Sequence, residues 1–367
     1  MSGADPRPTE EEKKAGVGIA PRLLVTIGLL VVLGLTLDPG DILAQLRRAR
    51  LPWIGLALLV SVGQVALSAW RWRFTATRLG LPLSFARALR EYYLATFLNQ
   101  VLPGGVLGDV SRAWRHGREG ESVTRGSAAR AVLLERASGQ MVMLATAAVC
   151  GAVLATGGAG GGIGAEAAVE SLRFWRDRGS GIGGGLAAGI AGSVLLLGLW
   201  ILALRWKGGR LEGVWERSWI EARRALLSPG AFLVQSVSSL TVVASYVLMF
   251  ILAARAVGVE APTALLVLLV PPVLLAMLIP LSFAGWGLRE GAAALLWAAV
   301  GLSATEGTAA SVMYGLLVLV SSLPGVLVLL VQRRSSPAPG RRGRLAPVES
   351  SGREDGGPDR EFPPAGG

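Results

Sequence analysis

The sequence predicts an all-helical, polytopic membrane protein, a bundle of six full spans plus two re-entrant or broken helical segments. Hydrophobic residues make up 52% of the 367 residues and charged residues 17%, and mean hydropathy is +0.52. A soluble domain this apolar would be unusual. Several uncharged runs reach the ~20 residues needed to cross a bilayer core. They are 51–70, 137–165, 179–204, 225–254, 261–288 and 307–332. Helices are expected because lipid leaves backbone groups no other partner except in closed barrels.

The distribution of basic residues predicts the orientation. Segment 71–131 holds ten Arg residues, whereas 254–263 and 282–308 hold one each. Basic residues gather on the cytoplasmic side of membrane proteins. We therefore expect a multi-pass protein of the cell (cytoplasmic) membrane with both termini in the cytoplasm. The same rule explains the net charge of +11, so no nucleic-acid partner is expected.

This orientation requires an even number of crossings and leaves two hydrophobic segments over. The expected crossings are 19–37, 52–70, 132–156, 184–204, 230–253 and 309–331. The first is not read as a signal peptide, because no clear cleavage site follows it. The segments left over, 83–108 and 262–303, would each enter and return on one side. The domain boundaries follow: a cytoplasmic tail 1–18, a membrane domain 19–331 with halves 19–156 and 184–331, and a disordered cytoplasmic tail 332–367.

The two broken segments match each other. Pro103 and Pro280 are 177 residues apart, and the same offset relates Gly108 to Gly285 and Arg112 to Arg289. With three crossings per half, the second half would be inverted. Paired interrupted segments in inverted repeats indicate the binding site of a transporter. The alternative is that each Pro kinks an ordinary membrane helix.

The first broken segment combines flexible backbone with charge. It reads "PGGVLGD", with Pro103, Gly104, Gly105 and Gly108 shaping the backbone, and then reaches Asp109 and Arg112. Glycine lets backbone approach a ligand closely, and the N-terminal end of a broken helix favours anions. Arg112 could bind a phosphate through two hydrogen bonds, with Asp109 holding it in place or competing with the anion.

The charges of this region allow two interpretations. The alternative to a ligand site is that the whole Arg cluster is a positive-inside anchor in contact with headgroups. We favour the anchor for Arg115 and Arg118, and ligand binding for Asp109 and Arg112. Glu135, in "VLLERASGQ", would lie two turns inside the third span. It either pairs with an Arg of the first broken segment or forms a helix-end ion pair at the interface.

The second broken segment reads "IPLSFAGWGLREG", with Pro280, Gly285 and Gly287 in the backbone break. Arg289 and Glu290 are the only charges between Ala261 and Ala304. Ionisable groups in such a setting are costly unless they are paired or line a cavity. We expect these two neighbours to find partners elsewhere, because adjacent residues point to different faces. Arg289 is a candidate headgroup ligand, and the alternative is that it snorkels to the interface.

Signs of covalent chemistry are lacking in the sequence. No catalytic triad or G-x-S-x-G is recognisable, so no catalytic residue is assigned and no enzyme is expected. The run "GGAGGGIG" at 157–164 lacks the GK[ST] ending of a P-loop and is expected to be an external linker. The single Cys150 belongs to no metal motif, so neither a metal nor a cofactor is expected. Residues 205–228, with Trp215 and Trp219, predict an interfacial amphipathic helix.

These motifs together resemble the flippase-like transmembrane domain family. The resemblance rests on "LNQVLPGGVLGDVSRAWRHGREG", "ARAVLLERASG" and "LIPLSFAGWGLREG", and covers roughly 20–331. The family includes the membrane portion of lysylphosphatidylglycerol synthases and domains attached to some dolichyl-phosphate sugar transferases. Leu107 stands where family members often have a second Gly before the Asp of this motif. The synthases carry aminoacyl transfer on a separate soluble domain. Since only about 36 polar residues follow the last span, that activity is not expected here.

The resemblance implies lipid handling in the membrane. We expect a protein that binds and translocates an anionic phospholipid or a polyprenyl-phosphate-linked lipid between leaflets. Asp109, Arg112, Arg289, Glu290 and Glu135 are the expected headgroup-binding residues. An intramembrane lipid-modifying transferase is one alternative. A non-transporting membrane partner of a separate glycosyltransferase or synthase is another.

Overall fold

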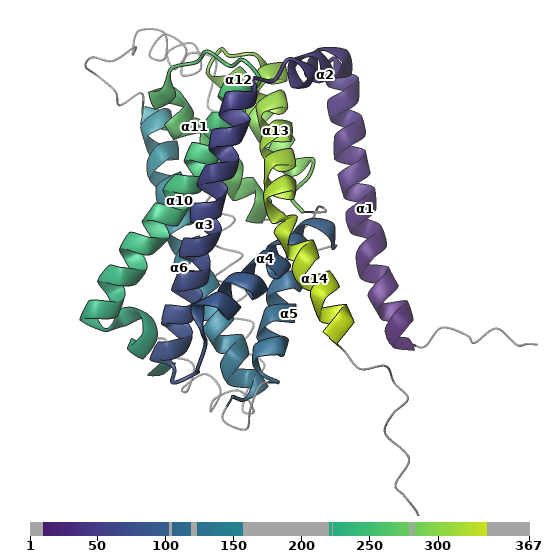
Figure 1. The fold of residues 1–367 in the computed structure, drawn as a ribbon. Coiled ribbons are helices and arrows are strands. Elements are labelled where there is room, and N and C mark those ends of the chain that lie inside the picture. The colour runs from purple at the N-terminus through teal and green to yellow at the C-terminus, as the bar shows by residue number, and fades with distance from the viewer. Residues whose placement is uncertain are drawn as a thin grey trace, which may run out of the picture.

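The computed structural model describes residues 10–102, 105–118, 123–156, 220–221, 223–278, 282 and 284–335. Every regular element in these ranges is helical, and none is a strand (Figure 1). The elements are α1 (Glu10–Thr36), α2 (Pro39–Arg47), α3 (Leu51–Arg78), α4 (Phe85–Val101), α5 (Leu107–His116), α6 (Arg125–Thr156), the π-helical turn η1 (Arg223–Leu227), α10 (Pro229–Ala256), α11 (Thr263–Leu275), the 3-10 turn η2 (Ala276–Leu278), α12 (Leu288–Ala299), α13 (Ala304–Ser322) and α14 (Pro324–Ser335).

Four described helices are long and apolar enough to cross a membrane: Leu51–Arg78, Arg125–Leu154, Pro229–Ala256 and Ala304–Val331. A fifth span is added if α1 is taken together with α2, which is bent away from it by 93°. These helices correspond to five of the six expected crossings. The remaining crossing, at 184–204, lies outside the described residues, as do the tails 1–9 and 336–367, the linker 157–164 and Trp215 and Trp219 of the expected amphipathic helix.

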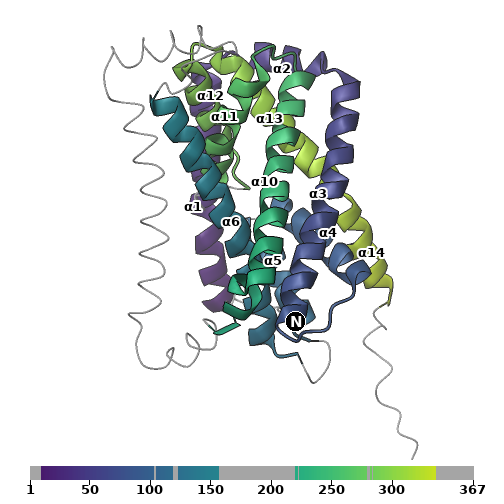
Figure 2. The same cartoon turned by 90° about the vertical axis from the view of Figure 1, so that its left-hand side faces the viewer.

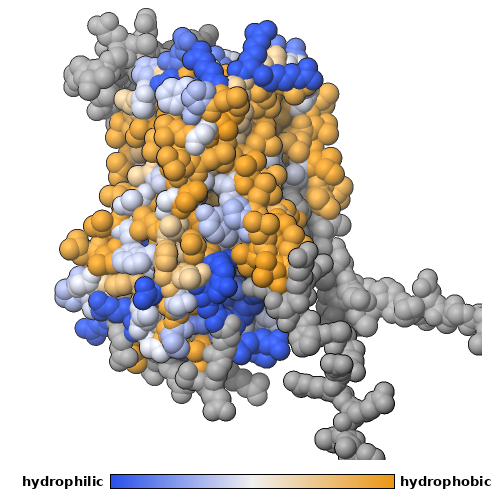
Figure 3. All heavy atoms as spheres, in the orientation of Figure 1, coloured by the Kyte–Doolittle hydropathy of each residue, from blue (hydrophilic) through white to orange (hydrophobic). Residues whose placement is uncertain are grey.

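The outer surface has the polarity expected of a membrane protein. Figure 3 shows hydrophobic side chains across the middle of one face, with hydrophilic side chains gathered at the two ends of the bundle. Large apolar residues on α1, α3 and α10 are strongly exposed, among them Leu35, Leu59 and Leu233. In water such a surface would drive association. In a bilayer it faces acyl chains.

Helices α3 and α10 pack along each other. The buried stripe of α3 consists largely of small residues, including Ala57, Ser61 and Ala69. Small residues allow membrane helices to approach closely, which is where packing between such helices gains its energy. Beside them, Phe250 of α10 contacts the rings of Trp297 and Tyr314, at centroid distances of 6.2 and 5.2 Å. This aromatic group joins α10 to α12 and α13.

The first broken segment is two separate helices, so a kink in one continuous helix is the wrong description of it. Helix α4 ends at Val101 and α5 begins at Leu107. Gly105 has a φ of +64°, which favours glycine; Pro103 and Gly104 lie outside the described residues. The expected end of this broken segment at residue 108 is also wrong, because α5 continues to His116. The return arm is α5 itself, whose buried residues include Gly108 and Arg112 and whose inner face packs on α4 and α6.

Gly108 explains how α5 can lie so close to α4. A Cβ atom at this position would come within 1.9 Å of the Ala95 carbonyl oxygen of α4. The backbone N–H of Gly108 donates to the Asn99 side chain, at 2.7 Å. A residue with any side chain would therefore push α5 off α4.

The second broken segment is interrupted in the same manner. Helix α11 gives way to η2, and α12 starts only at Leu288. Between them Ala284, Gly285 and Gly287 all have positive φ, of 49°, 81° and 86°. Pro280 lies outside the described residues. The chain turns back here through backbone conformations that L side chains rarely adopt.

From α3 and from α10 onward, the described elements of the two halves follow the same order. Helices α3 and α10 are each 28 residues long. Each is followed by an interrupted segment (α4 and α5, or α11 and α12) and then by a long helix, α6 or α13 with α14. Figures 1 and 2 show α4 and α5 in the lower half of the bundle and α11 and α12 in the upper half.

The close approach at Gly108 generates a first prediction. Gly108→Ala should destabilise the protein by about 1–3 kcal/mol, because the added methyl overpacks the α4–α5 contact. The thermal unfolding midpoint of the detergent-purified protein measures this loss. Gly55→Ala is the matched control, since a Cβ there meets nothing within 4 Å. Equal midpoints for the two variants would show that α5 does not lie against α4 as described.

Candidate functional site

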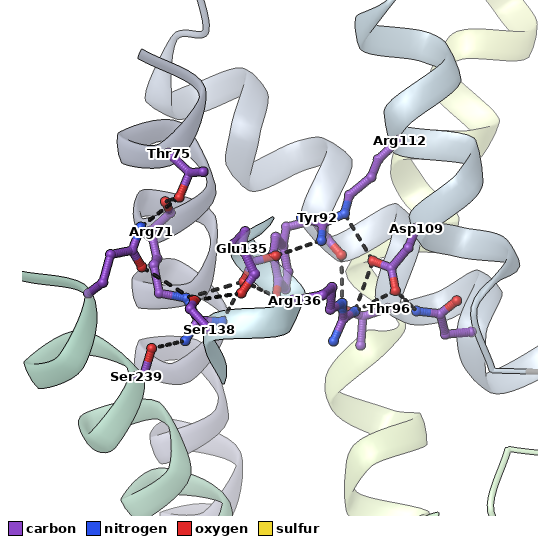
Figure 4. Close-up of polar contacts among 12 residues, drawn as sticks. Arg71, Thr75, Tyr92, Thr96, Asp109, Arg112, Glu135, Arg136, Ser138 and Ser239 are labelled. Atoms are coloured by element: carbon purple, nitrogen blue, oxygen red, sulfur yellow. Dashed lines mark hydrogen bonds and ion pairs between the residues drawn. The ribbon is translucent and has the colours of Figure 1, made fainter. Parts of the chain in front are cut away.

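The largest group of buried charges in the described residues lies where α3, α5 and α6 meet. We call it the charge cluster; its members are Arg71 of α3, Asp109 and Arg112 of α5, and Glu135 and Arg136 of α6. Arg71, Arg112 and Glu135 are at most 3% exposed. Figure 4 shows their side chains pointing toward one another, from helices far apart in the sequence.

Glu135 is the centre of the charge cluster. Its carboxylate accepts from Arg71, whose Nε lies 3.2 Å from Oε1, and from Arg112, whose Nη2 lies 2.7 Å from Oε2. The Tyr92 hydroxyl lies 3.5 Å from Oε1. A buried carboxylate is stable only when it is paired in this way. The interpretation of Glu135 as a partner of the first broken segment is confirmed.

Asp109 joins α5 to α6 on the other side of Arg112. Its Oδ1 lies 2.9 Å from Arg112 Nε, and its Oδ2 lies 2.8 Å from Arg136 Nη2. Asn99 of α4 adds a hydrogen bond to Oδ2, at 3.2 Å. The side chains of Asp109 and Arg136 are 13% and 32% exposed. The charge cluster therefore opens toward this side.

Arg112 is held between two aromatic rings. Its guanidinium carbon lies 4.8 Å from the ring centre of Trp72 and 4.7 Å from that of Tyr92, within the range of a cation–π interaction. Its Nη1 is buried and has no hydrogen-bond partner among the described residues. An unsatisfied buried donor costs ~1–3 kcal/mol. Arg112 thus has a spare donor in a fixed plane.

The charge cluster carries a net charge of +1, because three Arg residues face two carboxylates. His116 does not add to it. This residue lies at the end of α5, outside the long apolar helices, with Nε2 at 3.2 Å from the Pro82 carbonyl. Burial lowers the pKa of His116 from its usual value of 6.5, so the ring is neutral at pH 7.

Helix α10 connects to the charge cluster by hydrogen bonds. Arg71 Nη1 donates to the Ser239 hydroxyl at 3.0 Å. One turn away, the Gln235 amide donates to the Thr75 hydroxyl at 2.7 Å. Both contacts hold α3 in register with α10 and point the Arg71 side chain at Glu135.

A second, smaller cluster lies at the start of α12. Arg289 Nε donates to Glu290 Oε1 at 3.1 Å and to the Ser311 hydroxyl of α13 at 2.9 Å. Both charged side chains are at most 2% exposed. The guanidinium also lies 5.2 Å from the ring centres of Trp286 and Tyr314.

The expectation that Arg289 and Glu290 find partners elsewhere is wrong. Glu290 is the third residue of α12, and its Oε2 accepts from the Gly287 backbone N–H at 2.7 Å. In the first helical turn such a carboxylate folds back over the helix start. This brings it beside Arg289, although the two residues are adjacent. The burial of Arg289 also excludes snorkelling to the interface.

The structure separates the expected headgroup residues into two groups. Asp109, Arg112 and Glu135 meet in the charge cluster, while Arg289 and Glu290 form the second cluster. No hydrogen bond or ion pair links the two groups among the described residues. Arg115 and Arg118 lie outside both: Arg115 pairs with Glu91 at 2.9 Å, and Arg118 stacks on Trp114.

Sequence reasoning missed Arg71, Tyr92 and Asn99 as parts of the site, and read Arg136 only as a neighbour of Glu135. Arg71 was counted among the cytoplasmic charges, because the uncharged run ends at Trp70. One signal could have revealed it. Ser61, Ser68 and Thr75 recur every seven residues, which marks one polar face of a helix continuing past Trp70. Arg71 is four residues before Thr75 on this face.

Comparison with known proteins adds one match. Residues 18–325 match the sequence pattern of a family described as the lysylphosphatidylglycerol synthase TM region. No curated protein and no solved structure matches the chain. Among the described residues, no group of His, Cys, Asp and Glu could hold a metal ion.

The central position of Glu135 generates a second prediction. Glu135→Gln should destabilise the protein by about 3–5 kcal/mol, because it leaves Arg71 and Arg112 buried without their counter-charge. Thermal unfolding in detergent measures this loss. Glu221→Gln is the control, because its pair with Arg130 is about a quarter exposed and should contribute at most ~1 kcal/mol. Similar losses in both variants would contradict the central role of Glu135.

Proposed function

The chain belongs to the lysylphosphatidylglycerol synthase TM region family, and from this premise we propose that it binds an anionic membrane lipid and translocates it between leaflets. The family relates the chain to membrane phospholipids. The lipid would be a phospholipid or a polyprenyl-phosphate-linked molecule, since both present a phosphate. The charge cluster would be the headgroup site.

The observation that carries the proposal is the spare donor of Arg112. The charge cluster has one positive charge in excess, and Arg112 Nη1 is buried without a partner among the described residues. A phosphate oxygen at Nη1 would satisfy this donor and neutralise the excess charge. Charge-assisted hydrogen bonds of this kind are about twice as strong as neutral ones. The partly exposed side of Asp109 and Arg136 is the route by which a headgroup reaches Arg112.

Two further features support movement across the membrane rather than binding alone. Arg112 contacts Glu135 on the long helix that follows α5, and Arg289 contacts Ser311 on the long helix that follows α12. In both halves a buried Arg of the interrupted segment thus contacts the long helix that follows it.

We further propose that the two halves form an inverted repeat of six spans in the cytoplasmic membrane, with both termini in the cytoplasm. The matching order of elements and the opposite positions of α4 with α5 and α11 with α12 support it (Figure 1). In such repeats the interrupted helices form the substrate site near the midplane. The broken segments would then be re-entrant, one from each side.

Under this proposal the protein acts without covalent chemistry. Its sequence has no ATP-binding motif, so movement would be passive or coupled to an ion. A lipid-modifying transferase and a non-transporting partner of a separate synthase are the alternatives that the experiment must distinguish.

The third prediction concerns Arg112. In proteoliposomes with a fluorescent phosphatidylglycerol, the wild-type protein should accelerate the loss of protected lipid on addition of a membrane-impermeant quencher. Arg112→Gln should slow this movement at least about tenfold, since losing a charge-assisted hydrogen bond costs ~1.5–3 kcal/mol. Arg118→Gln, two residues beyond the end of α5 and outside the charge cluster, should move lipid at the wild-type rate.

The same preparation distinguishes the alternatives. A transferase would convert the lipid to a new species in detergent, where no sidedness exists, and mass spectrometry would detect it. A partner protein would leave the lipid in place until its enzyme is added. Wild-type rates in Arg112→Gln would remove the charge cluster as the transport site.

The fourth prediction concerns the inverted repeat. Ala86 and Ala264 occupy the first turns of α4 and α11, and both are exposed. In a background where Cys150 is replaced by Ala, Ala86→Cys and Ala264→Cys should react with an impermeant maleimide from opposite sides of the membrane. In oriented vesicles, labelling of both from the same side would exclude the inversion.

A further inference from the structure

A separate cavity lies at the end of the bundle that α2 crosses, away from both buried clusters. Its volume is about 350 Å³, and its walls are α2, the start of α3 and the C-terminal end of α10. This volume is at the lower end of the range for small-molecule sites. Helix α2 is bent by 93° from α1 and lies across the ends of the long helices (Figure 1). In the proposed membrane orientation this end of the bundle would lie at the depth of lipid headgroups.

The walls of the cavity are held in place without a ligand. The Asp38 side chain accepts from the Gly40 N–H at 2.7 Å and caps α2. The Arg50 N–H donates to the Ala256 carbonyl at 2.9 Å, which ties the start of α3 to the end of α10. Arg255 donates to the carbonyls of Val259 and Ala261, at 2.6 and 2.7 Å. These bonds fix the turn at Gly258, whose φ is +92°.

One face of α2 supplies the chemistry of the cavity. Asp41, Gln45 and Arg48 follow one another at helical spacing and all line it, together with Arg50. The guanidinium groups of Arg48 and Arg50 make no ion pair with any described residue. They are therefore available to a phosphate, which arginine binds through two parallel hydrogen bonds. Figure 3 shows hydrophilic side chains gathered at this end.

The cavity also has groups that favour a cation. The Gln45 amide oxygen is buried and accepts no hydrogen bond from the described residues. Asp41 carries a negative charge one helical turn before it. The wall formed by Ala256, Val257 and Gly258 is the C-terminal end of α10, where the helix dipole is negative. Acceptors and positive charges thus line the same cavity.

We infer that this cavity binds the headgroup of a zwitterionic phospholipid, one whose phosphate is followed by a primary ammonium. The phosphate would lie at Arg48 and Arg50, and the ammonium would donate to Gln45 and Asp41. A purely anionic headgroup would leave the buried Gln45 oxygen unsatisfied. The inference deepens the proposed lipid handling by adding a second binding site at the membrane surface, but binding there is measurable without any transport.

The test is calorimetric titration of the full-length protein in a nonionic detergent with dihexanoyl-phosphatidylethanolamine. Arg48→Gln and Asp41→Asn should each weaken binding about tenfold, because each removes a charged hydrogen-bond partner worth ~1.5–3 kcal/mol. Arg47→Gln is the matched control, being a neighbouring exposed residue of α2 that does not line the cavity. It should bind as the wild type does.

Other ligands and one further variant decide what the cavity recognises. Dihexanoyl-phosphatidylglycerol, which has the phosphate but no ammonium, should bind at least about tenfold more weakly, and sodium phosphate should not compete at equal concentration. Binding unchanged in Arg48→Gln, or equal binding of either anion, would overturn the inference. Arg112→Gln should retain this binding, so failure at the cavity and failure of the proposed transport site are separately visible.

Discussion

The pairing of Glu135 with two buried Arg residues is the interaction on which the rest of the structure depends. Three helices each bring a charge to one point that is closed to water, and none of these charges could stay there alone. Arg71 reaches Glu135 from α3, and Arg112 reaches it from α5. The positions of α3, α5 and α6 are therefore coupled through one carboxylate. Helix α10 joins the same arrangement through Ser239 and Arg71.

The backbone breaks make this arrangement possible. Arg112 can face Glu135 only because α5 turns back along α4, and α5 can lie there only because Gly108 has no side chain. In the other half, the positive φ angles before α12 serve the same purpose for Arg289. In each half, a flexible turn thus places one Arg in the interior, where an uninterrupted helix would carry it elsewhere.

The two halves share this design but differ in charge. The charge cluster has an Arg in excess and is open beside Asp109 and Arg136. The second cluster pairs one Arg with one Glu and is closed over by Trp286 and Tyr314. Under the proposed function, a phosphate would gain more at the charge cluster, where it would supply a missing counter-charge. The cavity beside α2 is distinct again, because it lies at the bundle's end and carries both signs of charge.

By itself the sequence determined the class of protein and the places where its helices break. Long uncharged runs specify membrane helices, and Pro103 and Pro280 with the glycines that follow them predict interruptions, because these signals are local and depend only on backbone and lipid. It also indicated Asp109, Arg112 and Glu135, since charges beside such breaks are costly unless they are used.

Only the tertiary structure decided which charges meet. Arg71 joins Glu135 across 64 residues, and Arg289 pairs with its own neighbour because Glu290 folds back over the start of α12. Partnership of this kind depends on how helices pack and where each begins, which no local pattern records.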